Sequence, residues 1–298
     1  LFKKDTGAFV EIFCLEPAFP DDYAVNFAQQ EKCRWKAIIG NMKRWKGEKI
    51  HLLLTESAEK TEILTSLTAE LIERVDNSAI VEFNWGGGYT FSQVIEQAGR
   101  IPIPPYLKRD TEAIDYNRYQ TYYAKHEGSV AAPTAGLHFT EELNEKIKAK
   151  GIEILEVTLH VGLGTFKPVK EENVEDHNMH SEFYSMSKQT ADRLNLAKKE
   201  GRRIIGIGTT STRTLETIMS KYGEFRECSG DTNIFIYPPY EYKAIDAQIT
   251  NFHLPKSTLI MMISALCSRE MILNTYKVAV QEKYRFFSFG DSMFIDNE

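Results

Sequence analysis

Three consecutive glycines, Gly86, Gly87 and Gly88, divide the sequence into two stretches of different periodicity. Before them, short apolar runs of strand length follow one another, including Ala8–Glu16 and Trp35–Ile39. Such spacing is typical of a small barrel or sandwich. After them, helical and strand patterns alternate, which indicates an α/β domain. We therefore predict a β domain over residues 1–88 and an α/β domain over residues 89–298.

Sequence signals at segment ends predict the individual elements. In the first stretch we expect further strands at residues 50–55 and on both sides of the turn-forming pair Asp76-Asn77. In the second stretch we expect helices at residues 91–98, 140–150 and 187–200, and strands at 152–160 and 203–207. The proline-rich segment Ile101–Arg109 predicts a stiff, extended strap.

Composition excludes several classes of protein. Hydrophobic residues make up 42% and charged residues 26%, as in a soluble globular protein. The longest apolar stretch, Leu259–Cys267, is far shorter than the roughly 20 residues of a membrane-spanning helix. The four cysteines are scattered without a C-x-x-C pair, which argues against a zinc ribbon or a disulfide framework. We therefore expect a cytoplasmic protein without a membrane partner. Because Leu1 lies inside a strand-like pattern, we also expect residues to precede it.

The net charge of −6 does not indicate a nucleic-acid-binding protein, but the charge is unevenly distributed. The segment Glu31–Lys49 holds seven basic and two acidic residues and interleaves two tryptophans with them. Cations can contact phosphates while indoles stack on bases, although a strand edge guarded by lysines would look the same. The candidate RNA-binding residues here and in the proline-rich strap are Arg34, Trp35, Lys43, Arg44, Trp45, Lys46, Lys108 and Arg109.

Two segments combine small residues with a histidine. Gly128–Phe139 is almost uncharged and ends next to His138, and its small side chains would let a ligand approach the backbone. A tightly packed loop with a core histidine is the alternative. In His160–Phe166 a strand ends in a glycine loop, where Gly162 and Gly164 would expose N–H groups to an anion or a base edge.

Two further segments offer polar groups beside apolar ones. In Ile204–Glu216 a strand leads through two glycines into Thr209, Thr210, Ser211 and Thr212 and then a helix. A helix N-terminus favours an anion, so the segment is a candidate site for a carboxylate, ribose or phosphate. It lacks the lysine of a P-loop and the third glycine of a dinucleotide fingerprint, and a well-capped helix is the alternative. In Thr250–Leu259, His253 and Lys256 flank a proline next to an apolar helix.

One cluster has the spacing of metal ligands. It lies between Glu175 and Glu182 and contains His177 and His180. Its acidic, loop-like surroundings favour a solvated surface, so we predict no bound metal. The sequence has neither G-x-S-x-G nor H-E-x-x-H, which disfavours a serine hydrolase or a zinc protease.

Seven segments, found in the same order, resemble the S-adenosylmethionine:tRNA ribosyltransferase-isomerase family of queuosine biosynthesis. They span residues 119–140, 160–169, 179–184, 208–216, 232–240, 250–261 and 282–291. The resemblance implies an α/β domain built from both ends of a longer chain, with a small β-barrel inserted, so the N-terminal part of that domain would be missing here. One departure is Pro239, where the family pattern has glycine.

The resemblance also implies a reaction. The ribosyl part of S-adenosylmethionine is transferred to 7-aminomethyl-7-deazaguanine at the tRNA wobble position and isomerised, giving epoxyqueuosine-tRNA, adenine and methionine. From residue type we predict His138 and His253 as the acid–base pair, with His160 and Glu182 as further catalytic candidates. The predicted contacts to S-adenosylmethionine are Gly162, Gly164, Thr209, Thr210, Ser211, Thr212 and Arg213.

Two other functions stay open on the sequence alone. One is an S-adenosylmethionine-dependent tRNA methyltransferase, and the other is a non-catalytic RNA-binding protein. For the favoured function we expect S-adenosylmethionine as co-substrate without a metal or another cofactor, tRNA carrying the queuosine precursor as partner, and a monomer.

Overall fold

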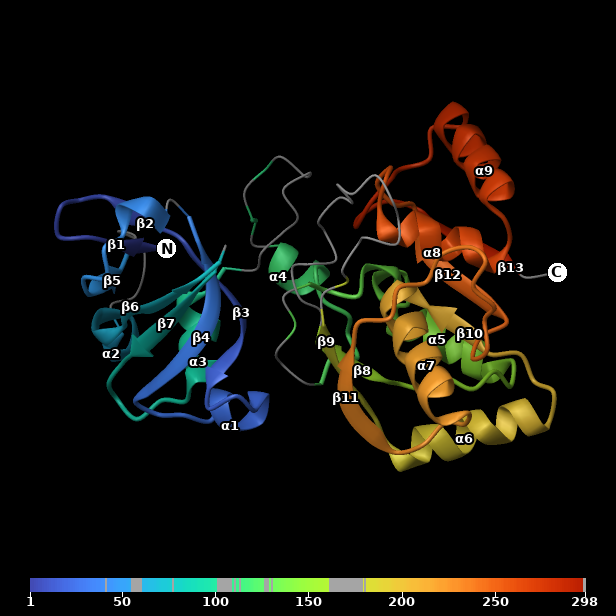
Figure 1. Cartoon of the computed structure of the whole chain (residues 1–298), viewed down its shortest axis with the longest axis horizontal. Helices are drawn as coiled ribbons and strands as arrows, with labels where there is room; N and C mark the ends of the chain where they lie inside the picture. Colours follow the sequence, from blue (N-terminus) through green and yellow to red (C-terminus); the bar gives the residue numbers. More distant parts are fainter. Residues whose placement is uncertain are drawn as a thin grey trace. The chain divides into compact units, whose positions relative to one another are not determined.

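The computed structural model describes residues 1–40, 42–54, 61–76, 78–100, 109, 111–112, 114–125, 129, 131–160, 179 and 181–296. The chain forms two compact units, unit 1 at Leu1–Pro102 and unit 2 at Ile103–Glu298 (Figure 1). Unit 1 extends beyond the predicted boundary at residue 88, because Phe91 and Val94 of helix α3 (Phe91–Ala98) are buried in its core.

Unit 1 is built around one seven-stranded antiparallel sheet of order β2-β1-β5-β6-β7-β4-β3. Its strands are β1 Phe2–Lys3, β2 Phe9–Val10, β3 Ile12–Phe19, β4 Lys32–Ile39, β5 Ile50–Leu52, β6 Thr68–Val75 and β7 Ser78–Asn84. Only Glu11 separates the two edge strands β2 and β3 along the chain. Because neighbouring strands lie about 4.8 Å apart, the sheet must curl back on itself. Among the described strands no pairing closes it, so a closed barrel is not confirmed.

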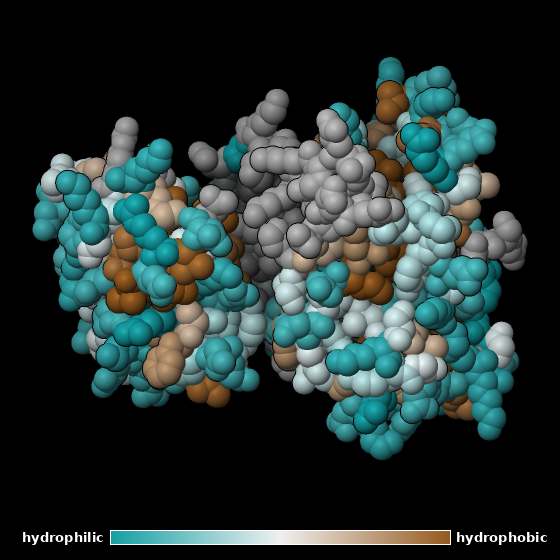
Figure 2. Space-filling model, in the orientation of Figure 1, coloured by the Kyte–Doolittle hydropathy of each residue, from teal (hydrophilic) through white to brown (hydrophobic). Residues whose placement is uncertain are grey.

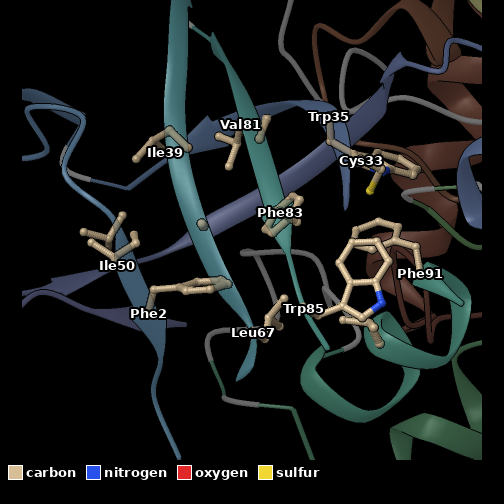
Figure 3. Packing of buried hydrophobic residues seen from close by; sticks show 14 of the residues in the cluster. Phe2, Cys33, Trp35, Ile39, Ile50, Leu67, Val81, Phe83, Trp85 and Phe91 are labelled. Atoms are coloured by element: carbon tan, nitrogen blue, oxygen red, sulfur yellow. The ribbon is translucent and has the colours of Figure 1, made fainter. Parts of the chain in front are cut away.

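Aromatic side chains fill the core of unit 1. In β4 every second residue points inward, so Cys33 and Trp35 are buried while Arg34 lies on the other face. Figure 3 shows Phe83, Trp85 and Phe91 packed side by side, and the centroids of the Trp85 and Phe91 rings are 5.2 Å apart. Short helices border this sheet: α1 Tyr23–Phe27, η1 Met42–Arg44, α2 Glu62–Ser66 and α3.

The burial of Trp35 and Trp45 corrects the expectation that they stack on RNA bases. Trp45 is 0% exposed, and its Nε1–H donates to the carbonyl of Glu48 over 2.7 Å. Trp35 is 4% exposed and donates to Asn26 Oδ1 over 2.7 Å. Neither ring is available to a ligand while unit 1 is folded, because the apolar faces of the indoles are part of the core.

Unit 2 contains two three-stranded sheets. The first, of order β10-β12-β13, comprises β10 Ile205–Ile207, β12 Ala247–Asn251 and β13 Ser292–Asp296. In it β10 and β12 are parallel. The second, of order β11-β9-β8, comprises β8 Thr158–His160, β9 Glu182–Met186 and β11 Cys228–Thr232 and is antiparallel. This is a mixed α/β arrangement, as expected for the second unit.

The helices of unit 2 connect these strands. They are α4 Asp115–Arg118, η3 Thr134–His138, α5 Glu141–Ala149, α6 Lys188–Lys199, α7 Gly208–Tyr222, α8 Thr258–Leu266 and α9 Arg269–Gln281. The helices predicted at residues 140–150 and 187–200 are confirmed as α5 and α6, each with the expected hydroxyl N-cap. The predicted strand at residues 152–160 shortens to β8, and the threonines after β10 belong to the first turn of α7 rather than to a loop.

The surface is predominantly polar on the face that Figure 2 shows, where hydrophobic residues form small, separate groups. Within the described ranges no helix is long and apolar enough to cross a membrane. All four cysteines are free thiols, as their scattered positions predict.

Replacement of Trp45 by alanine should lower the unfolding free energy of unit 1 by about 3–5 kcal/mol, because it opens a cavity in a packed core. The three tryptophans all lie in unit 1, so the fluorescence of Trp35 and Trp85 during urea unfolding reports this unit alone. Lys43→Ala, at an exposed neighbouring position, should change the unfolding free energy of unit 1 by no more than about 0.5 kcal/mol. Equal small effects of both substitutions would contradict the assigned burial.

Candidate active site

The parallel pairing of β10 with β12 brings two of the candidate segments to one edge of a sheet. Gly208 and the first turn of α7 follow β10, and Asn251 is the last residue of β12. The carboxyl ends of parallel strands are where ligands bind in α/β sheets. A Cβ on Gly206 would lie 2.6 Å from Thr212 Oγ1, so only glycine lets α7 pack this closely on β10.

Helix η3 packs against this edge. A Cβ on Gly136 would lie 2.1 Å from the hydroxyl of Tyr123, and the Cβ of Ala135 is 3.5 Å from the position of a Cβ on Gly208. Both Ala135 and Gly136 are buried. Their small size therefore serves close packing of the chain, which is the alternative interpretation of this segment. His138, at the end of η3, remains partly exposed.

His138 reaches the end of β12 and also lines a cavity. Its Nε2 is 3.0 Å from Nδ2 of Asn251. Burial and the nearby Arg285 guanidinium lower the pKa of His138, and Asp291 opposes this shift. The cavity has a volume of about 470 Å³ and is bordered by segments from α4 to α5 and by the loop before β13. Its polar and charged lining residues are Arg118, Gln120, Thr121, Tyr122, Thr140, Glu141, Arg285 and Ser288, besides His138 itself.

His253 lies two residues beyond β12 and does not border this cavity. Its Nε2 is 3.0 Å from Thr250 Oγ1, and its backbone N–H donates to the Tyr276 hydroxyl over 2.8 Å. Burial lowers the pKa of His253 to about 4. The imidazole is therefore neutral at pH 7 and is suited to accept a hydrogen bond, because a pKa this far below neutrality makes it a weak base and leaves it without the proton of a general acid.

Arg213 and Glu182 form a buried ion pair. Nη1 of Arg213 donates to Oε2 of Glu182 at the start of β9, and both side chains are at most 3% exposed. Nε and Nη2 of Arg213 are buried and have no hydrogen-bond partner in the described part of the chain. In Arg193 the same two nitrogens hold both oxygens of the Glu153 carboxylate, at 2.6 and 2.8 Å. The unpaired edge of Arg213 thus has the shape that binds a carboxylate with two hydrogen bonds.

The hydroxyls around Arg213 are partly used within α7. Thr212 donates to the carbonyl of Gly208 over 3.2 Å and is fully buried, so its hydroxyl is not open to a ligand. Thr209 is buried as well, whereas Thr210 and Ser211 are partly exposed. Glu216 is structural: its carboxylate accepts hydrogen bonds from the Tyr240 hydroxyl and from backbone N–H groups at residues 243–245.

The remaining predicted residues are placed as follows. His160 is buried at the end of β8, and its ring stacks on Phe183 with centroids 5.7 Å apart. Gly162 and Gly164 lie outside the described residues, as do Glu175, Asp176, His177 and His180 of the metal-like cluster. Among the residues that the structure describes, no three histidine, cysteine, aspartate or glutamate side chains are grouped closely enough to hold a metal ion.

The basic candidates for RNA binding are divided between the two units, and some of them lie outside the described residues. Arg34 Nε donates to Glu82 over 2.8 Å, and Lys43 and Lys46 are exposed. Both Arg109 Nη atoms hold the Asp115 carboxylate, at 2.6 and 2.8 Å, which lowers the pKa of Asp115 to about 2. The side chain of Arg44 and all of Lys108 lie outside the described residues.

Asn251 is one of three residues beside His138 that the sequence did not identify. It lies within the same segment as His253, but its partner His138 is 113 positions away along the chain. Arg118 and Arg285 were not identified either, because nothing in their local sequence places them beside His138.

Comparisons with known proteins agree on one family. A family model described as queuosine biosynthesis protein matches residues 1–295. S-adenosylmethionine:tRNA ribosyltransferase-isomerases from two strains of Clostridium kluyveri are each 58% identical over 230 residues, which is 77% of this chain and 66% of theirs. The chain thus spans about two thirds of the length of these relatives. A crystal structure of S-adenosylmethionine tRNA ribosyltransferase from Thermotoga maritima is 31% identical with a TM-score of 0.47, covering 99% of this chain and 77% of that one.

The depressed pKa of His253 should make unit 2 less stable in mild acid. The unfolded chain binds a proton below its ordinary pKa of 6.5 but the folded protein only near 4, so stability is complete above pH 6.5 and falls as the pH drops toward 4. The full loss is about 3 kcal/mol. His253→Gln should flatten the pH dependence of the urea midpoint measured by circular dichroism, whereas His51→Gln, at an exposed position, should not. If the urea midpoint of His253→Gln varied with pH as steeply as that of the wild-type protein, the lowered pKa of His253 would be refuted.

Removal of the Glu182 carboxylate should lower the unfolding free energy far more than removal of the carboxylate of a surface ion pair. Glu182→Ala leaves the Arg213 charge buried without compensation, so the unfolding free energy of unit 2 should fall by about 3–5 kcal/mol. Glu153→Ala breaks the more exposed pair with Arg193 and should cost about 1 kcal/mol or less. Comparable losses in urea unfolding would show that the Glu182–Arg213 pair is not buried as described.

Proposed function

Because the chain belongs to the queuosine biosynthesis protein family, we propose that it is an S-adenosylmethionine:tRNA ribosyltransferase-isomerase. It transfers the ribosyl moiety of S-adenosylmethionine to 7-aminomethyl-7-deazaguanine at the tRNA wobble position and isomerises it, releasing adenine and methionine. The observation that carries this proposal is the family match over residues 1–295, together with curated relatives of that name at 58% identity.

The proposed chemistry needs groups that move protons near neutral pH. The sulfonium acidifies the ribose C5′ protons, the aminomethyl group must be neutral to attack, and adenine leaves more readily when protonated. We keep His253 as the second member of the acid–base pair, in which its neutral ring serves as a hydrogen-bond acceptor. His138 would exchange a proton with the reacting groups bound in the cavity that it lines. His160 stays a further catalytic candidate.

The buried ion pair supports a binding role for Arg213 and a positioning role for Glu182. Arg213 holds the methionine carboxylate of S-adenosylmethionine with Nε and Nη2, the edge without a partner in the described part of the chain. Glu182 fixes the guanidinium by its contact with Nη1, which makes it a poor general acid or base. The exposed hydroxyls of Thr210 and Ser211 are the accessible polar groups of the same helical turn.

Contacts to tRNA are proposed for cationic side chains rather than for indoles. Arg118 and Arg285 line the cavity beside His138, where they would hold phosphates next to the wobble base. Exposed Lys43 and Lys46 would add contacts from unit 1, which we propose to be a small barrel inserted in the longer family chain. The same proposal includes a cytoplasmic monomer that uses no metal.

Product analysis tests the proposed reaction. Incubation with S-adenosylmethionine and precursor-bearing tRNA should release free adenine and add the mass of the epoxycyclopentanediol group to the nucleoside. His138→Gln should lower kcat by about 100-fold or more if this histidine transfers a proton, and Lys199→Gln, an exposed change on α6, should not. A methylated nucleoside without adenine would indicate a methyltransferase, and tRNA binding without turnover would indicate a non-catalytic RNA-binding protein.

A further inference from the structure

Asn251 is a buried amide that contacts the ring of His138. It is 3% exposed at the end of β12, and its Nδ2 lies 3.0 Å from His138 Nε2. Its Oδ1 is buried and has no partner in the part of the chain that the structure describes. A buried amide with one unused acceptor is uncommon and calls for an explanation.

The orientation of this amide follows from the relative cost of unpaired groups. If Asn251 were turned by 180°, Oδ1 would accept from His138 Nε2–H and the two N–H groups of Nδ2 would be buried without a described partner. Buried N–H groups are left unpaired less often than carbonyl oxygens. The amide therefore donates to Nε2, which makes Nε2 the acceptor and puts the proton of the neutral imidazole on Nδ1.

From this contact, and on the basis of the proposed function, we infer that Asn251 is a positioning residue that fixes the tautomer and orientation of His138. Because Nε2 is occupied by Asn251, Nδ1–H is the ring position left to a ligand in the cavity. In the resting enzyme His138 thus presents a hydrogen-bond donor to the substrate.

The unpaired Oδ1 gives Asn251 a second role when His138 takes up a proton. Protonated Nε2–H can no longer accept from the amide, but rotation of the amide brings Oδ1 onto Nε2–H. This rotation breaks no described hydrogen bond of Oδ1, because it has none. Asn251 therefore holds the ring in one orientation with Nδ1 protonated in both states, whereas an aspartate would keep the proton on Nε2 and an apolar side chain would fix neither nitrogen.

Four other charged groups lie around His138, and two of them form an ion pair. Asp291 and Arg285 come from the loop before β13, Arg118 from α4 and Glu141 from α5. The Arg285 contact lowers the pKa of Asp291, so both members of that pair stay charged between pH 5 and 8. The Asp291–Arg285 pair therefore adds no protonation change in this interval, and the ring signals of His138 itself identify its titration.

Nitrogen NMR of the histidine rings tests the inference in the intact protein, without turnover. The His138 signals, assigned by their loss in His138→Gln, should show a protonated Nδ1 and an unprotonated Nε2 at pH 8. Asn251→Asp should raise the pKa of His138 by one unit or more, because a carboxylate then faces Nε2. Asn251→Leu should give a mixture of tautomers and a kcat at least 10-fold lower, with little change in KM for S-adenosylmethionine.

Asn195→Asp is the matched control, since Asn195 holds the backbone of Phe225 through its amide. It should change stability without moving the His138 signals. The inference is overturned if His138 of the wild-type protein carries its proton on Nε2, a result that needs no variant. It is also overturned if Asn251→Asp folds and the pKa of His138 is unchanged. Failure of the proposed function looks different, because the NMR pattern would hold while the wild-type protein released no adenine.

Discussion

The buried contact between Glu182 and Arg213 joins the two sheets of unit 2. Glu182 belongs to β9, while Arg213 lies in α7, the helix that packs on β10 through Gly206 and Thr212. A buried guanidinium needs a fixed partner, so the pair ties the start of β9 to α7. The position of α7 in turn places Gly208 against η3, and η3 places His138 next to Asn251. The geometry of the candidate site therefore depends on the position of α7, which this ionic contact and the packing on β10 fix together.

The electrostatic character of the site follows from the same packing. Around the carboxyl ends of β10 and β12 two histidines are held neutral, His253 by burial and His138 by burial and Arg285. The buried positive charge of Arg213 is compensated by only one carboxylate oxygen contact among the described residues, which leaves an edge suited to an anion. Neutral imidazoles and an unpaired guanidinium edge are the features that the proposed reaction of a sulfonium nucleoside would use.

Local sequence signals predicted the regular elements well, and long-range contacts limited the rest. Helix α3 is confirmed at residues 91–98 because Thr90 and Gln93 form a capping box. The interpretation of Trp35 as a base-stacking residue was wrong because it followed the type of side chain and not its position in the strand. In β4 every second residue is buried, and Trp35 lies on the same face as buried Cys33 and two further apolar residues. The start of α7 was misplaced because Gly208 enters the helix with a φ of +85°, which sequence does not reveal. The contact between His138 and Asn251 depends on tertiary packing alone.

In the proposed function Arg213, held by Glu182, binds the carboxylate of S-adenosylmethionine through Nε and Nη2. Calorimetry with S-adenosylmethionine and with its decarboxylated analogue, on the wild-type protein and on Arg213→Lys, measures this interaction as a coupling between ligand and side chain. The account predicts that loss of the carboxylate weakens binding to the wild-type protein by about 100-fold, in line with a bidentate charged pair. It also predicts that the same loss changes binding to Arg213→Lys by less than about 10-fold, because a lysine ammonium cannot form the paired contact. An equal loss for both proteins would contradict the account.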